Sequence, residues 1–220
     1  MRAKLIQLAV VLLTNLVLVP NFAIAQGNSE KMDEIKLFNG KDLNNWTFHL
    51  VDQTVEPSTV FSVQNGIIHI TGNPYGYMRT KEIYSDYKLH AEYRWPVEAA
   101  NSGVLIHMQM PDTIWSTCFE CQLKAGFAGD IGCKNGTDMT ERIDKTNKTV
   151  KRQADNSEKP SGEWNTIEVV CKSNTIEVYL NGILQNKGSN LSVSKGYIGL
   201  QSEGKDVEFR NVVLSKKSKK

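Results

Sequence analysis

Tyr87-Lys88-Leu89-His90-Ala91-Glu92-Tyr93-Arg94-Trp95 alternates apolar and polar side chains at every position. Because successive residues of a β-strand point to opposite faces of a sheet, this period of two predicts a strand with one buried face and one solvent-exposed face. The same alternation recurs over 103–110 and 118–124, and Asn-Gly dipeptides at 65–66 and 181–182 are typical of tight turns between strands. We therefore expect an all-β fold of about ten to twelve short strands, an antiparallel sandwich or barrel without helices.

One segment departs from this pattern. Residues 126–162 are weakly apolar and rich in Gly, Asp, Lys and Asn. The segment is expected to be a long loop, and such loops in a compact domain are usually functional or mobile.

The first 25 residues are typical of a secretory signal peptide. Arg2 and Lys4 precede an apolar run over 5–19, and Ala23-Ile24-Ala25 is a cleavage site of small residues. The run of about 15 residues is shorter than the roughly 20 that a transmembrane helix needs. We therefore expect an exported protein, periplasmic or extracellular, without a membrane span in the mature chain.

The chain after the expected signal peptide divides into a linker, one domain and a short tail. We expect a linker over 26–33, one domain over 34–215 and a basic tail over 216–220. The formal net charge is +2, and much of the positive excess lies in the tail. No run of basic residues with interleaved aromatic residues is present, so a nucleic-acid partner is not expected.

Four cysteines allow two interpretations in an exported protein: Cys118, Cys121, Cys133 and Cys171. They either include one disulfide, most plausibly through Cys133, or remain buried free thiols. Cys118 and Cys121 are three residues apart in a strand-like run, so their side chains point to opposite faces. That geometry disfavours a shared zinc ion or a redox pair.

Polar side chains meet on one sheet face if the three alternating strands are neighbours: Arg94, His107, Glu120 and Gln122. A glutamate near an arginine and a histidine suits proton transfer and the recognition of a polar substrate. The residues flanking Glu120 are apolar, which predicts partial burial and a raised pKa. The alternative is an ordinary solvated face, where Glu, Lys and Gln are routine.

Eight short motifs follow one another along the chain: Leu37–Trp46, Tyr87–Arg94, Asn101–Val104, Phe119–Gln122, Gly162–Asn165, Leu180–Gly182, Gly196–Gln201 and Phe209–Val212. In this order they resemble the 3-keto-disaccharide hydrolase-like family, whose N-terminal signature is close to LFNGKDLNNW at 37–46. The resemblance covers about residues 34–215, nearly the whole mature chain.

The resemblance implies a concanavalin A-like jelly roll of two antiparallel sheets, with the site on a concave sheet face. It also implies glycosides oxidised to 3-keto sugars as substrates. A ketone at C3 acidifies the C2 proton, so a base can remove that proton and the glycosidic bond at C1 breaks by elimination. Carried over onto this chain, Glu120 is the acid/base, and Gln122, Arg94 and Asn101 orient the substrate and support the oxyanion.

The chain departs from the family at three positions. His107 stands where many members have Arg, Glu203 where many have His, and Lys124 where Asp is frequent. We expect His107 to take over part of the chemistry beside Glu120. Together with Glu203 these two residues also form a donor set for a divalent metal, although no cofactor is otherwise expected.

Further substrate contacts are expected from five residues. Gln201 ends the 196–201 motif, and Glu203 and Lys124 lie near the expected site. Tyr77 follows a turn at 72–74 and is a candidate for the pocket rim, whereas Trp115 lies in a loop where it could stack on a sugar.

Three functions remain open at this point. The first is an exported enzyme that cleaves 3-keto-glycosides, the second is a lectin-like carbohydrate-binding module, and the third is a structural sandwich of the adhesion type. The alternating strands offer few aromatic residues for sugar stacking, which favours the enzyme. No nucleotide-binding motif is present, so a separate sugar 3-oxidoreductase would have to supply the keto substrate.

Overall fold

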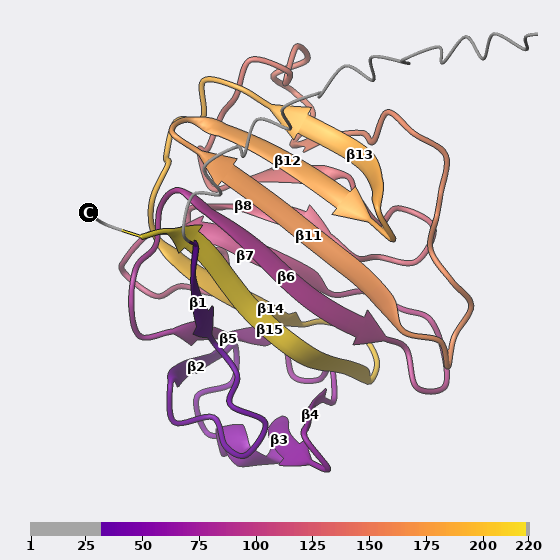
Figure 1. Cartoon of the computed structure of the whole chain (residues 1–220). Coiled ribbons are helices and arrows are strands. Elements are labelled where there is room, and N and C mark those ends of the chain that lie inside the picture. Colours follow the sequence, from indigo (N-terminus) through magenta and orange to yellow (C-terminus); the bar gives the residue numbers. More distant parts are fainter. Residues whose placement is uncertain (1–31, 219–220) are drawn as a thin grey trace, which may run out of the picture.

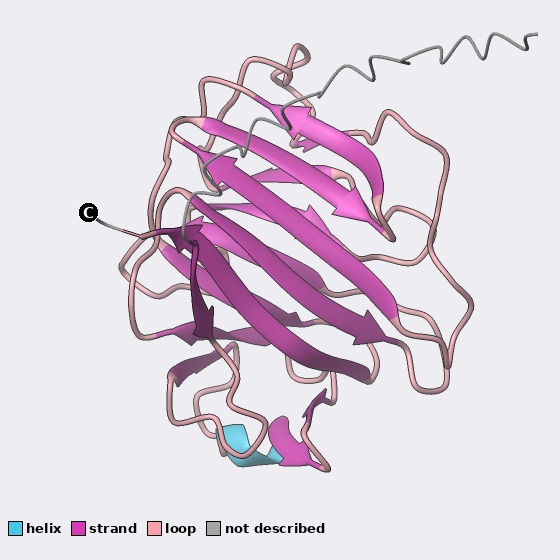
Figure 2. Ribbon diagram, in the orientation of Figure 1, coloured by secondary structure: helices cyan, strands magenta, loops and turns pink. Residues whose placement is uncertain are grey.

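The computed structural model describes residues 32–218. The expected signal peptide, the linker residues before Met32 and the last two residues of the tail lie outside the described residues. Two sheets face each other, with β11, β6 and β15 in front of β8, β7 and β14 in Figure 1. Figure 2 shows how completely strands dominate, since the described helical structure is one 3-10 turn, η1 (Pro57–Thr59).

The first sheet has eight strands. Its order is β13 (Ile183–Gly188), β12 (Thr175–Leu180), β11 (Asn165–Lys172), β6 (Tyr87–Arg94), β15 (Val207–Lys217), β4 (Ile67–Ile70) and β3 (Phe61–Gln64), while β1 (Met32–Lys36) pairs with β15.

The second sheet has seven strands. Its order is β10 (Thr149–Val150), β9 (Ile131–Lys134), β8 (Cys118–Gln122), β7 (Gly103–Met108), β14 (Tyr197–Ser202), β5 (Gly76–Thr80) and β2 (Trp46–Leu50). Every strand pair in both sheets is antiparallel, so the expected all-β sandwich of two antiparallel sheets is confirmed.

The alternation of β6 and β8 places their apolar side chains in one core between the sheets. Leu89 and Tyr93 of β6 are fully buried there, as are Phe119 and Cys121 of β8. Cys118, by contrast, packs in a separate small cluster on the other side of β8. We call the face of the seven-stranded sheet that points away from the eight-stranded sheet the open face.

All four cysteines are free and buried, which agrees with the second of the two interpretations, and they form no disulfide. Cys118 and Cys121 do lie on opposite sides of β8, as their spacing predicts. Burial raises the pKa of Cys118 to about 12, which keeps this thiol protonated and unreactive at neutral pH.

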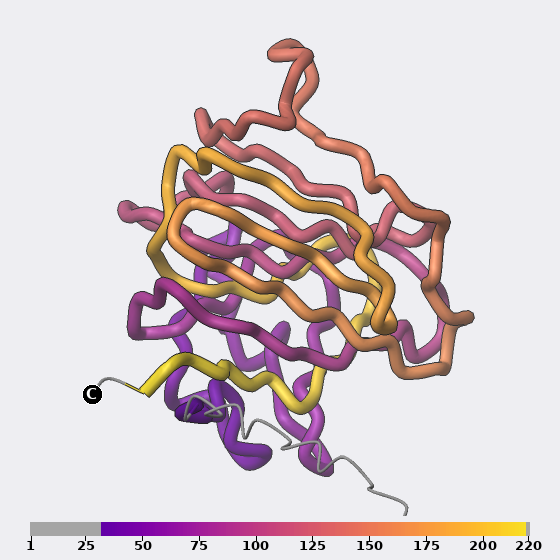
Figure 3. The backbone as a smooth tube through the Cα atoms, turned by 45° about the horizontal axis from the view of Figure 1, so that its top comes forward, coloured from indigo at the N-terminus to yellow at the C-terminus, as the bar shows by residue number. Residues whose placement is uncertain are grey.

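The segment 126–162 is not the structureless loop that its composition indicates. It contains β9 and β10, which extend the seven-stranded sheet beyond β8. Ile131 and Cys133 of β9 are buried in the core, so Gly132 and Lys134 lie on the open face. The stretch between β9 and β10 projects from the sandwich, as Figure 3 shows.

A β-bulge reverses the direction of one expected site residue, His107. The pairs Tyr197↔Met108 and Gly199↔Leu105 leave one extra residue on β7, and His107 has a φ of 52°. Its ring is therefore buried between the sheets, 5.9 Å from the ring of Tyr87 on β6. Met108, expected inside, packs instead in the cluster on the open face.

Strand pairing continues beyond the expected domain boundary. Lys216 and Lys217 belong to β15 and pair with Asp33 and Met32 of β1, so the expected tail begins within a strand. In the stretch from 32 to 218, no helix has the length and apolar character to cross a membrane.

The buried His107 predicts a pH-dependent stability. Desolvation lowers its pKa to about 4, against an ordinary value of about 6.5 in an unfolded chain. Between about pH 6.5 and pH 4 the histidine is therefore protonated in the unfolded state and neutral in the folded state. The free energy of unfolding declines as the pH falls through this range. The decline attributable to this residue is on the order of 3 kcal/mol.

The His107→Leu variant should lose this decline. We expect it to be about 1 kcal/mol less stable at pH 7, because Val193 O loses the partner that lies 3.1 Å from His107 Nδ1. Its unfolding free energy, measured by urea titration, should then fall less steeply between pH 7 and pH 4.5. The core variant Ile106→Val should keep the wild-type slope. Parallel curves for wild type and His107→Leu would contradict the assignment.

Candidate functional site

Glu120 occupies the middle of the open face. It lies on β8, opposite Gly132 of β9 and Leu105 of β7. A Cβ atom at Gly103 would lie 2.7 Å from Glu120 Oε1, and one at Gly132 would lie 2.9 Å from Oε2. The missing side chains of these two glycines therefore create the space that the carboxyl group occupies.

Glu120 forms a buried ion pair with Lys134. The Nζ of Lys134 lies 2.5 Å from Oε2, and the Glu120 side chain is only 1% exposed. The register that pairs Cys118 with Lys134 places the lysine one diagonal step from Glu120. The buried carboxylate is thus neutralised at close range by Lys134, the one ion-pair partner that it has among residues 32–218.

Opposing effects act on both partners of this pair. Desolvation raises the pKa of Glu120, Lys134 works against that shift, and the net direction is upward. Desolvation opposes the charge on Lys134, but Glu120 and Glu203 outweigh it and raise the pKa of the ammonium group. The result is a carboxylate of increased basicity next to a lysine that stays charged at neutral pH.

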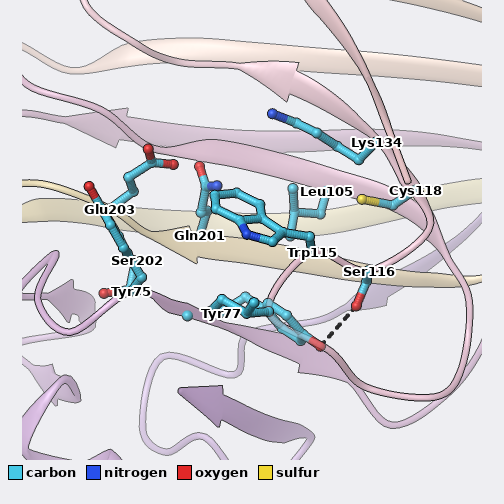
Figure 4. Close-up of a pocket in the computed structure, with 12 residues that line it drawn as sticks. Tyr75, Tyr77, Leu105, Trp115, Ser116, Cys118, Lys134, Gln201, Ser202 and Glu203 are labelled. Atoms are coloured by element: carbon cyan, nitrogen blue, oxygen red, sulfur yellow. Dashed lines mark hydrogen bonds between the residues drawn. The ribbon is translucent and has the colours of Figure 1, made fainter. Parts of the chain in front are cut away.

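A pocket opens on this face beside the ion pair, and Figure 4 shows its residues. It is lined by Tyr75, Gly76, Tyr77, Leu105, Ile114, Trp115, Ser116, Cys118, Lys134, Gln201, Ser202 and Glu203. Lys134 and Gln201 are the lining residues that also adjoin Glu120. The carboxyl group therefore lies beside the pocket, next to two of its lining residues.

The loop between β7 and β8 forms one wall of the pocket and carries Trp115. Asp112 of this loop binds Arg79 of β5 through two hydrogen bonds, of 2.7 Å to Nε and 2.6 Å to Nη2. Tyr77 Oη lies 3.1 Å from Asp112 Oδ1 and 3.0 Å from Ser116 Oγ. The wall is thus held against β5 by a charged pair and a tyrosine.

The opposite side of the pocket has buried acceptors without donors. Gln201 Oε1 and Asn101 Oδ1 have no hydrogen-bond partner among residues 32–218. The side chain of Gln201 lies near Glu120 and lowers the pKa of its carboxyl group. Among residues 32–218, Glu120 Oε1 nevertheless has no hydrogen-bond partner of normal geometry. An isolated bridge pairs Asn101 with Glu203. Of these two oxygens, that of Gln201 belongs to the pocket lining and is suited to receive a hydrogen bond from a substrate hydroxyl group.

Five of the expected site residues adjoin this pocket or line it. Glu120 is paired at its edge, while Gln201, Glu203, Tyr77 and Trp115 are among the lining residues. Tyr77 forms part of the floor rather than the rim, because its side chain is buried and its hydroxyl group is fully engaged. Asn101 lies next to Glu203, outside the lining.

Arg94 was expected on the same face and does not lie there. Its strand, β6, belongs to the eight-stranded sheet, so the two sheets separate it from Glu120. Arg94 pairs with Glu208 and stacks on the Trp164 ring at 4.7 Å. The alternation of β6 was correctly identified, but alternation does not say which strands become neighbours.

Three further residues expected at the site lie outside the pocket lining: His107, Gln122 and Lys124. The bulge on β7 puts His107 inside the sandwich, so it cannot act beside Glu120 or complete a metal-binding set with Glu203. Gln122 Oε1 accepts hydrogen bonds from the backbone N–H groups of residues 123 and 124. Lys124 lies over the Phe127 ring at 5.3 Å, outside the pocket lining. Within residues 32–218, no group of three His, Cys, Asp or Glu residues is arranged to hold a metal ion.

Sequence reasoning missed Lys134. The residue lies in the segment interpreted as a loop, although Ile131-Gly132-Cys133-Lys134 alternates as a short strand does. The signal that could have identified Lys134 is the alternation of apolar Ile131 and Cys133 with Gly132 and Lys134. It is strengthened by the apolar residues of β8, the strand that pairs with β9. Leu105, Ser116 and Cys118 were also missed as lining residues.

Comparison with solved structures confirms the jelly-roll fold. A glycosyl hydrolase candidate from Parabacteroides distasonis superposes with a TM-score of 0.64 at 20% identity, covering 84% of this chain and 94% of that chain. A carbohydrate-binding module from Bacillus subtilis gives 0.56 at 9% identity, covering 76% and 93%. A β-glucanase from Bacillus licheniformis gives 0.53 at 12% identity, covering 86% and 100%. At these identities the likeness shows the fold alone.

No curated protein matches the sequence. Residues 33–215 match the family described as the 3-keto-alpha-glucoside-1,2-lyase-like domain. The match spans both sheets, the pocket and the Glu120–Lys134 pair, and it confirms the resemblance carried by the eight motifs. The chain belongs to the 3-keto-alpha-glucoside-1,2-lyase-like domain family.

Proposed function

We propose that this protein cleaves 3-keto-glycosides by removing the C2 proton and eliminating the group at C1. Family membership supports a carbohydrate-active enzyme. The observation that carries the finer assignment is the buried Glu120–Lys134 pair at the edge of the pocket. One base and one cation are what this reaction requires, whereas ordinary glycosidases use two carboxyl groups around the scissile bond.

Glu120 is the base. A carboxylate that has lost its water shell holds a proton more tightly than a solvated one, so its raised pKa brings its basicity closer to the working pH. Lys134 limits this rise and keeps the carboxylate ionised. Burial and the ion pair together produce a strong base that is still deprotonated near neutrality.

The chemistry follows from this pair. Glu120 takes the proton from C2, and the C–H electrons form an enolate with the oxygen at C3. The enolate then collapses to re-form the C3 ketone and a C1–C2 double bond, and the bond from C1 to the leaving oxygen breaks. Protonated Glu120 returns its proton to that oxygen. Addition of water across the new double bond completes a hydrolysis.

Lys134 stabilises the negative charge that develops during proton removal. Its ammonium group lies against the base, in a site where the low dielectric strengthens electrostatic interactions. The Gln201 amide, beside the same carboxyl group, is the second polar group positioned to bind the substrate.

We further propose that the mature protein acts outside the cytoplasm on a substrate supplied by another enzyme. The N-terminal 25 residues support export, and the absence of a nucleotide-binding motif in the sequence indicates that oxidation at C3 occurs elsewhere. A lectin-like function on the same face remains the alternative, and turnover measurements separate the two.

Replacing the base is the primary test. The Glu120→Gln variant keeps the size of the side chain but cannot accept a proton, so kcat should fall by about 10²- to 10⁴-fold. The measurement is the release of aglycone from a 3-keto-disaccharide, followed by chromatography. The exposed Glu56→Gln change serves as the matched control and should leave turnover unchanged.

Two results would contradict this assignment. Unchanged turnover in Glu120→Gln would show that another group removes the proton. Tight binding of the keto sugar by the wild type without any aglycone release would favour the lectin-like alternative.

A second test uses the pH profile of kcat/KM. Activity requires ionised Glu120, so kcat/KM should fall as the pH drops through a pKa above the usual value for glutamate. Because Lys134 lowers that pKa, the Lys134→Met variant should show the acid limb displaced to higher pH, along with a lower plateau.

Lys124→Met is the matched control, since it removes a lysine from the same region of the sheet but outside the pocket lining. Its profile should overlay that of the wild type. If Lys134→Met lowers the plateau without moving the acid limb, the lysine does not act on Glu120.

A further inference from the structure

The pocket has two chemically different ends. In Figure 4, Gln201 and Glu203 lie on one side of the Trp115 ring, whereas Leu105 and Cys118 lie on the other. We call the first the polar end and the second, together with Tyr77, Trp115 and Ser116, the aromatic end.

The hydroxyl groups of the aromatic end are already occupied, and the Lys134 ammonium group, 6.0 Å from the centre of the Trp115 ring, is paired with Glu120. Tyr77 Oη bonds to Asp112 Oδ1 at 3.1 Å, to Thr113 O at 3.1 Å and to Ser116 Oγ at 3.0 Å. Ser116 Oγ also donates to Thr113 O at 3.0 Å. A hydroxyl group arriving here would lose its water without gaining a partner, and that loss is costly.

The Trp115 ring, in contrast, is available, whereas Tyr77, Leu105 and Cys118 are already buried beneath it. Leu105 and Cys118 pack with Tyr77 in the cluster on the open face. Trp115 is 51% exposed although it lies over the pocket, so part of its ring faces solvent. Covering that ring would bury apolar area and is favourable.

The wall that presents Trp115 is fixed in place. Asp112 is held by the bidentate contact with Arg79, and the Arg79 guanidinium lies 4.2 Å from the centre of the Tyr197 ring. Gln109 N donates to Thr117 O at 2.9 Å and closes the base of the loop. An aromatic surface held in this way binds a ligand at little cost in ordering.

The polar end has the opposite character, because the buried acceptor Oε1 of Gln201 lacks a donor among the described residues and Glu203 adds a carboxyl group. It also adjoins Glu120, so the sugar that undergoes proton removal fits there. The group that leaves from C1 then extends toward the aromatic end.

We infer that the leaving-group subsite takes an apolar, preferably aryl, aglycone rather than a second sugar. This inference rests on the proposed function for the orientation of the substrate. It narrows the substrate class to 3-keto-glycosides of apolar alcohols, because the aromatic end presents the exposed Trp115 ring, whereas its hydroxyl groups are already engaged.

Three substrates with the same 3-keto-glucosyl group test the inference. Their aglycones are methyl, benzyl and a glucose joined through its 6-hydroxyl group, all primary alcohols with similar intrinsic leaving ability. We expect kcat/KM for the benzyl compound to exceed that for the glucosyl compound by about tenfold or more, since an aryl ring gains from stacking on Trp115. Equal values, or a preference for the glucosyl compound, would overturn the inference.

Variants of the wall localise the preference. Trp115→Ala should remove the benzyl preference and change kcat/KM for the methyl compound by less than about threefold, because the methyl group does not reach the ring. Trp115→Phe should restore most of the preference. Phe127→Ala removes a comparably exposed ring outside the pocket lining and should have no effect. An equal loss on all three substrates in Trp115→Ala would contradict a leaving-group role.

Binding measurements keep this inference separate from the catalytic proposal. If none of the keto compounds is cleaved, the proposed function fails, and the unoxidised methyl, benzyl and glucosyl glucosides are then compared by tryptophan fluorescence titration. Tighter binding of the benzyl compound that disappears in Trp115→Ala would support the aromatic subsite. Equal affinities in wild type and variant would overturn it.

Discussion

The candidate site depends on one buried ion pair, between Glu120 and Lys134. Bringing two charges out of water is costly, and the cost is offset only when the partners meet at close range. Strand pairing between β8 and β9 provides that proximity, and the glycines at 103 and 132 leave the room that the carboxyl group needs. The register of the two strands thus determines the basicity of Glu120, because the burial that disfavours the charged pair also raises the pKa of this carboxyl group.

The bulge on β7 divides the open face into two chemical halves. Without the extra residue, His107 would face the pocket and Met108 would lie in the core. With it, Met108 joins Tyr77, Leu105 and Cys118 on the open face. The face therefore loses an ionisable group and gains an apolar cluster. This apolar half lies beside the polar half that Glu120 and Gln201 define, and the contrast between them is the basis of the proposed substrate orientation.

Much of the fold was predictable because alternation is a local property. The patterns over 87–95 and 118–124 correctly separated core positions from surface positions, and Glu120 was identified as a partly buried carboxyl group. The errors have equally physical origins. Arg94 was misplaced because no local pattern tells which strands become neighbours, and Lys134 was overlooked because β9 is short and lies among polar turns. His107 was misdirected because a single inserted residue reverses every side chain until the register recovers.

The amino-acid sequence by itself determined the strand content, the faces of the longer strands, the family and the candidate base. These follow from periodicities and motifs that each lie within a few neighbouring residues. Only the tertiary structure decided that Lys134 neutralises Glu120, that Arg94 belongs to the other sheet and that His107 is buried. Such facts depend on pairing between strands far apart in the chain, where the register of hydrogen bonds, rather than local composition, brings side chains together.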